Sequence, residues 1–345
     1  MARIRSYISI SLKMFNVNIH QQFNRIWYQG SRLYYFLLPL TAIFYLLSQI
    51  RKLYYTKIYR RKEFFVPVIT VGNLTVGGSG KTPMVLYLVT MLKEKGYQPG
   101  VIARGYKSKA YSPIHVDEHC SAADVGDEPL LVFHRTRIPV VVGRDRIKNL
   151  NYLVENFSCD IVICDDGLQD YRFMSAVELV MVDGERKFGN QHLLPAGPLR
   201  EPVSRLSECD YVIASNRPIP ELTQYSLSMK AVDTVKLNKP DVRADIDSWA
   251  GTTVHAVAGI ACPDRFFNML EKLGINTIKH PFPDHADFEI EDLTFNDQLP
   301  VFMTEKDAVK CHNMDLDNTW YIPVDVIMST QFVSDFNTRL RAVNG

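Results

Sequence analysis

Acidic residues are missing from the first 62 positions of this chain, although its 345 residues include 38 of them. Eleven lysines and arginines lie in the same segment, which leaves 28 basic against 38 acidic residues in the remainder. The formal net charge of +1 therefore combines a segment of charge +11 with a body of charge −10. Such a segment is typical of a chain that binds an anionic membrane surface, at about 1 kcal/mol for each basic residue near the headgroups.

Cysteine pairs are also missing. The six cysteines are scattered, with no C-x-x-C pair and no histidine-rich partner segment, which argues against a zinc site or a disulfide framework and fits a reducing cytoplasm. No internal repeat or low-complexity tract is present. Hydrophobic residues make up 46% of the chain and charged residues 22%, which excludes global disorder and supplies a real core.

Residues 33–50 contain no charge at all and read LYYFLLPLTAIFYLLSQI. A helix of this length would be about 27 Å long, close to a hydrocarbon core of roughly 30 Å. We expect a membrane anchor that either spans the bilayer or lies in it; a buried core helix, interrupted by Pro39, is the alternative. The heavier positive flank follows the run, which places the body on the cytoplasmic side. The run begins too late for a cleaved signal peptide.

Short apolar runs alternate with helical periodicity in the body. They lie at 67–72, 101–104, 139–143, 160–166, 177–183 and 210–215. Continuous apolar strands of this kind predict a parallel sheet covered on both faces. Further runs at 253–259, 300–304 and 319–326, with a helix at 263–273, predict a second, smaller α/β lobe.

The predicted fold class is therefore α/β, with a P-loop NTPase-like, mostly parallel sheet, a smaller α/β lobe and an N-terminal membrane-associated helix. We divide the chain into a basic anchor segment at 1–62, a larger α/β lobe at 63–235 and a smaller C-terminal α/β lobe at 236–345. Two such lobes imply a cleft between them.

A glycine-rich turn, GNLTVGGSGKT, follows the first strand of the body. Its backbone N–H groups and a helix N-terminus can hold phosphates, Lys81 can reach the β and γ oxygens, and Thr82 can bind Mg²⁺. The general pattern requires glycine where this chain has Thr75. A turn that only packs is the alternative, but Lys81 would repel the positive end of the helix dipole unless an anion is bound. The predicted nucleotide-binding residues are Thr75, Val76, Gly77, Gly78, Ser79, Gly80, Lys81 and Thr82.

Acidic residues in three further segments are candidates for the site. Asp165 and Asp166 end an apolar strand, where a parallel sheet places its ligands, and one or both could bind Mg²⁺ directly or through water. A cap of the turn DDGLQD is the alternative. The acidic loop GDEP at 126–129 and the proline-braced loop LLPAGPLREP at 193–202 are further candidates, with a helix N-terminus and a surface ion pair as their alternatives.

Seven segments together resemble the tetraacyldisaccharide 4'-kinases of lipid A synthesis. They are VGNLTVGGSGKTP (71–83), GDEP (126–129), DDGLQ (165–169), LLPAGPLREP (193–202), GIACPDRFF (259–267), HPFPDH (280–285) and MTEKDAVK (303–310). The resemblance extends from about residue 27 to residue 324 and includes Thr75, because T-V-G-G-x-G-K-T is the family's own form. It implies two α/β lobes with an N-terminal membrane helix.

The resemblance also implies an activity and a location. The chain is expected to transfer the γ-phosphate of ATP to the 4'-hydroxyl of an acylated glucosamine disaccharide 1-phosphate, with ATP and Mg²⁺ as cofactors. Its expected partners are that lipid and the membrane surface, without nucleic acid or an obligate protein partner. The expected place is the cytoplasmic face of the inner membrane of a Gram-negative bacterium.

The family's catalytic Asp–His dyad corresponds to Asp127 and His285 here. Its Mg²⁺-binding acids correspond to Asp165, Asp166 and Glu201. Lys81, with Mg²⁺ on Thr82, would stabilise the charge of the γ-phosphoryl group, while His285, polarised by Asp127, would accept the proton of the sugar hydroxyl. Further candidates for holding phosphate oxygens are Arg144, Arg146 and Arg200.

Two departures and two alternatives remain. Ala286 stands where many members have a second histidine, and the first 20 residues have no counterpart, so Met14 could be an alternative start. A membrane-associated P-loop NTPase acting as a regulatory switch would use the same loop and anchor, but the chain has no guanine-reading N-K-x-D. A lipid-binding anchor protein without activity would leave the GKT at 80–82 unexplained.

Overall fold

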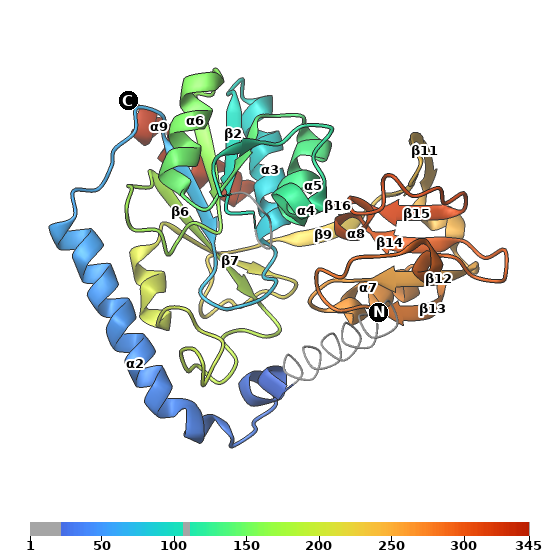
Figure 1. Cartoon of the computed structure of the whole chain (residues 1–345), viewed down its shortest axis with the longest axis horizontal. Coiled ribbons are helices and arrows are strands. Elements are labelled where there is room, and N and C mark those ends of the chain that lie inside the picture. The colour runs from blue at the N-terminus through green and yellow to red at the C-terminus, as the bar shows by residue number, and fades with distance from the viewer. Residues whose placement is uncertain (1–21, 106–110, 345) are drawn as a thin grey trace, which may run out of the picture.

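The computed structural model describes residues 22–105 and 111–344 and contains two α/β lobes. Figure 1 shows the larger lobe beside the smaller one, with helix α2 (Tyr34–Leu53) along the side of the larger lobe that faces away from the smaller. The predicted fold class is confirmed. The predictions made for residues 1–21 lie outside the described residues.

The larger lobe is built on an eight-stranded sheet in the order β3-β4-β2-β5-β1-β6-β7-β8. All neighbouring strands are parallel except β3 and β4. The predicted parallel sheet is therefore present. Its strands are β1 (Val68–Gly72), β2 (Pro99–Ala103), β3 (Ile114–His115), β4 (Val140–Val142), β5 (Ile161–Asp165), β6 (Val177–Asp183), β7 (Tyr211–Ser215) and β8 (Tyr225–Ser226).

Helices cover both faces of this sheet because its strands are apolar on both sides. Ile69 and Val71 of β1 pack in one core cluster with α3 (Lys81–Glu94) and α5 (Asp127–Thr136). Val68, the neighbour of Ile69, points to the other face and packs in the cluster of α6 (Arg146–Asn156). The short helices α4 (Ala122–Val125) and η2 (Val203–Glu208) complete the lobe.

The smaller lobe has a six-stranded sheet in the order β11-β10-β15-β14-β12-β13. The strands are β10 (Asp233–Lys236), β11 (Lys239–Asp245), β12 (Thr253–Ala258), β13 (Asn276–Pro281), β14 (Val301–Thr304) and β15 (Thr319–Ile322). Its helices are η3 (Ile246–Trp249), α7 (Pro263–Lys272), η4 (Ile290–Leu293) and α8 (Glu305–Ala308). The second α/β unit expected from the sequence is thus found, with α7 one residue shorter than predicted.

A two-stranded ribbon joins the lobes. It pairs β9 (Ser228–Ala231) with β16 (Val324–Ile327) in antiparallel register. The run at 319–326, which the sequence suggested as one strand, is divided at Pro323 between β15 and β16, which pair in different sheets. Proline has no N–H to donate to a sheet, so this division costs no hydrogen bond.

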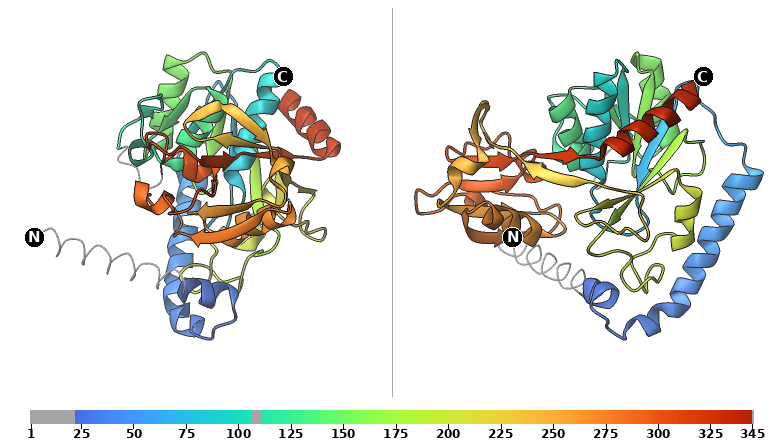
Figure 2. Two further views of the ribbon diagram at one scale, coloured as in Figure 1. Left: turned by 90° about the vertical axis from the view of Figure 1, so that its right-hand side faces the viewer. Right: turned by 180° about the vertical axis from the view of Figure 1, so that it is seen from behind.

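The last helix returns to the larger lobe. Figure 2 shows α9 (Thr330–Asn344) lying along that lobe, after the chain has passed back through the ribbon. Phe332, Phe336 and Leu340 are buried there in one cluster with Tyr211 of β7. The division proposed from the sequence assigned this helix to the C-terminal lobe, because its apolar spacing does not say which core it enters.

Helix α2 is exposed along almost its whole length. Thr41 is its one buried residue, while Phe36 is 82% exposed and Leu47 is 61% exposed. Together with the π-helical turn η1 (Tyr54–Ile58), it forms a helical segment at 34–58 that is long and apolar enough to cross a membrane. The exposure of this helix argues against the core-helix alternative.

Candidate active site

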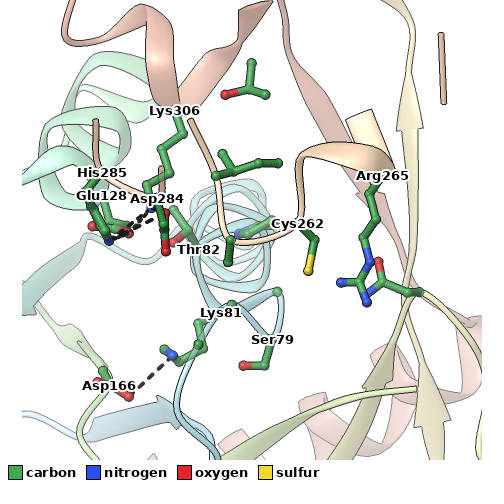
Figure 3. Close-up of a pocket in the computed structure, with 18 of the residues that line it drawn as sticks. Ser79, Lys81, Thr82, Glu128, Asp166, Cys262, Arg265, Asp284, His285 and Lys306 are labelled. Atoms are coloured by element: carbon green, nitrogen blue, oxygen red, sulfur yellow. Dashed lines mark hydrogen bonds and ion pairs between the residues drawn. The ribbon is translucent and has the colours of Figure 1, made fainter. Parts of the chain in front are cut away.

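The glycine-rich turn that the sequence analysis proposed as a phosphate loop lies between β1 and α3, and we call it the phosphate loop below. Gly80 precedes the helix with φ of 84°, and a Cβ there would lie 3.0 Å from Cβ of Ser215, so only glycine fits without strain. Lys81 Nζ donates to Asn73 Oδ1 at 3.1 Å and lies 3.5 Å from Asp166 Oδ1 (Figure 3). The hydroxyl of Ser79 is buried without a hydrogen-bond partner among the described residues, so it can bond to a ligand in this loop.

Asp165 and Asp166 end β5 beside this loop but have different environments. Burial raises the pKa of Asp165 to about 7 against the charge of Lys81, and its Oδ1 has no hydrogen-bond partner in the described part of the chain. Burial acts in the same direction on Asp166, but the charges of Lys81 and Arg200 outweigh it and lower the pKa of Asp166. Arg200 Nη1 lies 2.9 Å from Asp166 Oδ2.

A polar site with one unpartnered, buried carboxylate oxygen is chemically suited to a hard cation. Among residues 22–105 and 111–344, however, no three histidine, cysteine, aspartate or glutamate side chains gather closely enough to hold a metal ion. Mg²⁺ usually takes one or two carboxylates and completes its shell with substrate phosphates and water. Asp165 and the nearby Thr82 fit that pattern, because both line the same cavity as the phosphate loop.

Glu201, the third predicted metal ligand, is almost fully buried and binds protein donors. Its Oε2 accepts a hydrogen bond from Gln169 Nε2 at 2.9 Å, and its Oε1 accepts from the hydroxyl of Tyr171. Arg205 Nε lies 3.8 Å from the same carboxylate. Gln169 Oε1 in turn accepts a hydrogen bond from Arg200, the arginine that binds Asp166. Glu201 therefore helps to position Gln169 beside the site. The metal-binding role of Glu201 stays a prediction.

Asp127 and His285 are brought together from different lobes. Asp127 begins α5 of the larger lobe, His285 follows β13 of the smaller lobe, and Asp127 Oδ2 lies 2.8 Å from Nδ1 of the imidazole. Burial would raise the pKa of Asp127, but the hydrogen bond from His285 and the charge of Lys310 lower it. Asp127 is therefore an ionised acceptor that fixes the orientation of the ring.

A lysine that the sequence analysis left without a role lies beside this pair. Lys306 Nζ is 2.8 Å from Glu128 Oε1, 3.2 Å from Asp284 Oδ1 and 3.4 Å from His285 Nε2 (Figure 3). Lys306 lies in the segment MTEKDAVK at 303–310, which is one of the seven segments that carry the family resemblance. Its partners, however, could not be read from any local spacing.

A second interlobe contact lies on the opposite side of the phosphate loop. Arg265 of α7 binds the buried carboxylate of Asp183, at the end of β6, with two contacts of 2.8 and 3.0 Å. It also binds Glu185 at 2.6 Å. The lobes are thus held together on both sides of the space between them.

One large cavity, of about 2420 Å³, connects these features. It is lined by the phosphate loop, Asp165, Asp166, Glu201 and His285, and it extends to Phe44 and Leu47 of α2. Two predicted site residues lie outside its lining: Thr75, which is buried and pairs with Leu199, and Asp127, which reaches the cavity through His285. The arrangement can hold a phosphate donor on one lobe and present a proton acceptor from the other.

The three arginines suggested as phosphate ligands have different surroundings. Arg200 lines the cavity, whereas Arg146 is buried and donates to the carbonyl of Asp166 at 2.6 Å. Arg144 stacks on the ring of Tyr111 at 3.9 Å, away from the cavity lining. Only Arg200 is therefore placed to reach a bound phosphate.

Comparison with known proteins gives consistent matches. The family model described as Tetraacyldisaccharide-1-P 4'-kinase matches residues 33–341. The chain is 42% identical over 310 residues to the Tetraacyldisaccharide 4'-kinase of Nitrosococcus oceani, covering 89% of this chain and 91% of that relative. It is 42% identical over 323 residues to the enzyme of the same name from Shewanella oneidensis, covering 93% and 95%.

A solved structure is similar as well. The crystal structure of LpxK from Aquifex aeolicus in complex with ATP matches with a TM-score of 0.78 at 26% identity, over 91% of this chain and 100% of that one. The sequence matches and the fold match therefore agree on one family.

Proposed function

Because the chain belongs to the tetraacyldisaccharide 4'-kinase family, we propose that the cleft between its lobes is where a lipid acceptor receives a phosphoryl group from ATP. The protein is a lipid kinase of lipid A biosynthesis, and its acceptor is an acylated disaccharide 1-phosphate phosphorylated at the 4'-hydroxyl. Membership of this family favours the kinase over the regulatory-switch alternative. The proposal rests on His285, which is held by Asp127 and lines the same cavity as the phosphate loop. Formation of ADP by purified protein, dependent on the acylated disaccharide 1-phosphate, tests it.

His285 is the proposed general base. Its Nδ1 faces the carboxylate of Asp127, so Nε2 is the atom that would accept the proton of the 4'-hydroxyl. Asp127 would hold the ring in this orientation and stabilise the imidazolium formed as the proton moves. The larger lobe would hold the nucleotide and the smaller lobe would supply the base, which makes the two lobes functional units.

The phosphate loop is the proposed donor site. Its backbone N–H groups and the Ser79 hydroxyl would bind the phosphate oxygens of ATP, and the Lys81 ammonium would stabilise the negative charge of the transferring group. Arg200, which lines the same cavity, would add a second positive charge. Phosphoryl transfer needs this positioning and charge neutralisation more than covalent help from the protein.

Magnesium is the proposed metal cofactor. Thr82 and Asp165 would hold it, with Asp166 and Glu201 at the edge of the site. A bound Mg²⁺ neutralises phosphate charge and orients the phosphate chain. The buried, unpartnered oxygen of Asp165 supports this assignment.

The Asp165→Asn variant should need at least ~10-fold more Mg²⁺ for half-maximal activity, because a neutral amide is a much weaker ligand than a carboxylate. Asp160→Asn is the matched control, because Asp160 immediately precedes β5 at the end far from the site and its carboxylate accepts a hydrogen bond from Gln98 N at 2.7 Å. Asp166→Asn should lower turnover by releasing Arg200. Overlapping Mg²⁺ titrations of parent and Asp165→Asn would show that Asp165 only caps its turn.

Membrane attachment through α2 is proposed as well, on the cytoplasmic face of a Gram-negative inner membrane. The exposed apolar helix is followed by the basic residues of 51–62, and the cavity extends to Phe44 and Leu47. A lipid acceptor could then reach the cleft from the bilayer without leaving it completely.

Replacing Phe36 and Leu46 together by glutamate should reduce binding to vesicles containing anionic phospholipid by at least ~10-fold at high salt, since each charge in the hydrocarbon costs roughly 2.5–3.5 kcal/mol. At low salt the basic stretch at 51–62 should retain part of the binding. Flotation measures both. Ile290→Glu, at an exposed apolar position of the smaller lobe, is the control. Unchanged, salt-resistant flotation of the double variant would place the anchor elsewhere.

A further inference from the structure

We propose that Lys306 is a positioning residue that keeps the imidazole of His285 neutral, with the lone pair of Nε2 available to a hydroxyl in the cleft. The inference rests on the proposed function of His285 as the base. It concerns a residue to which neither the sequence motifs nor the family name assigns a role. The contacts of the Lys306 ammonium with three acceptor groups carry the argument.

Asp127 alone does not determine the charge of the ring. It accepts the proton on Nδ1, and that proton is present both in one neutral tautomer of histidine and in the imidazolium. The state of Nε2 therefore depends on what faces it. A general base needs Nε2 without a proton, so a second group has to select the neutral form.

Lys306 has the chemistry to make that selection. An ammonium has three N–H donors and no acceptor, so the ring nitrogen that faces it at 3.4 Å presents a lone pair rather than an N–H. A proton on Nε2 would bring two positive groups into contact. Asp127 and Lys306 together thus specify the tautomer from both sides of the ring.

The other charges around the ring act in the opposite direction. Asp127 and Glu128 face it from α5, Asp284 lies next to it in its own loop, and Glu128 and Asp284 each approach Nε2 to 3.8 Å. Three carboxylates alone would stabilise the imidazolium. Lys306, from α8, binds two of them directly and so offsets their effect on Nε2.

The ammonium of Lys306 is held charged and in place. Burial lowers the pKa of Lys306, but Glu128 and Asp284 outweigh burial and raise it above the ordinary lysine range. The buried carboxylate of Asp307, the next residue, accepts hydrogen bonds from Gly259 N at 2.9 Å and from the Thr304 hydroxyl at 2.6 Å. The first bond ties α8 to Gly259, whose carbonyl also accepts a hydrogen bond from His285 N at 3.2 Å.

The contact between Lys306 Nζ and His285 Nε2 is also the easiest of the three to break. At 3.4 Å it is the longest of the three contacts, and the carboxylates of Glu128 and Asp284 hold the ammonium without it. The acceptor hydroxyl can therefore donate to Nε2 while Lys306 stays bound to both carboxylates. The ring is kept ready without being blocked.

Lys306→Met tests the proposal, because methionine keeps most of the length and removes the charge. The imidazole of His285, followed by NMR in protein labelled with ¹⁵N-histidine, should take up its proton about one pH unit higher than in the parent, as expected for the loss of one adjacent like charge. His285→Ala identifies the signal. Lys306→Arg should restore the parent titration to within about 0.3 unit, and Lys239→Met, which removes an exposed charge from the same lobe, should not change it.

The activity profile separates this proposal from the proposed function. The acidic limb of kcat/KM should move to higher pH in Lys306→Met by the amount seen for the ring, with the KM for ATP within about twofold of the parent because the phosphate loop is untouched. A shifted ring with an unshifted limb would support the Lys306–His285 contact and reject His285 as the base. An unshifted ring would overturn the role of Lys306.

Asp284→Asn keeps the test available if Lys306→Met does not fold. Asp284 is half-exposed, and asparagine preserves an acceptor for Lys306. Removing this carboxylate should make the His285 ring take up its proton at lower pH, opposite to the effect of losing Lys306. A titration unchanged in Asp284→Asn would contradict the balance of charges on which the proposal depends.

Discussion

Lys81→Ala should lower kcat/KM for phosphoryl transfer at least ~10³-fold, because one charge aimed at the transferring group can supply several kcal/mol of transition-state stabilisation. The ammonium is already directed into the site by Asn73 Oδ1 at 3.1 Å and Asp166 Oδ1 at 3.5 Å. A bound phosphate chain would find it in place. Transfer of radiolabelled γ-phosphate to the lipid acceptor gives the measurement.

Two comparisons make this result specific. Lys95→Ala, at an exposed position after the other end of α3, should keep the parent rate. The thermal unfolding of Lys81→Ala should stay close to that of the parent, because Lys81 contributes to a polar site rather than to the core. If the variant retained a third of the parent activity, the phosphate loop would have to be reassigned.

The strand, turn and helix around the proposed phosphate loop could be predicted because their signals are local. Strand, glycine-rich turn and helix follow one another within residues 68–94, and the structure places them in that order. The continuous apolar strands likewise predicted a sheet covered on both faces, since burial on both sides leaves no polar alternation. These features depend on neighbours in the sequence.

The pairing of Asp127 with His285 was accessible only through the family resemblance. The two residues are 158 positions apart and enter the cleft from different lobes. No periodicity or spacing in either loop indicates the other. Lys306 was missed for the same reason, because its charge is meaningful only once Glu128 and His285 are known to face it.

Packing partners limited the prediction elsewhere. No helix was predicted at 330–344, and only the structure shows that Phe332 and Phe336 of α9 enter the core of the larger lobe. Glu201 was expected to bind a cation because the family resemblance placed it among the Mg²⁺-binding acids. Its contacts with Gln169 and Tyr171 depend on another loop, which the sequence does not position.

Asp127→Ala, His285→Ala and the double variant should each lose a similar factor in kcat, of about 10²–10⁴, if the two residues act as one unit. The reason is geometric: Asp127 contacts the ring of His285 at 2.8 Å and does not itself line the cavity. Once the ring is absent, removing Asp127 has nothing further to disturb. The KM for ATP should change little, because the phosphate loop belongs to other elements.

The pH profile provides the independent test of the same unit. A general base works only when unprotonated, so kcat/KM of the parent should fall at acidic pH, and this acidic limb should be absent from His285→Ala. In Asp127→Asn the limb should persist but move to lower pH, because the ring loses an adjacent negative charge that favours its protonated form. Strictly additive losses in the double variant, or an acidic limb preserved in His285→Ala, would reject the dyad. His285 would then be a residue of the substrate loop, held in place by Pro281 and Pro283.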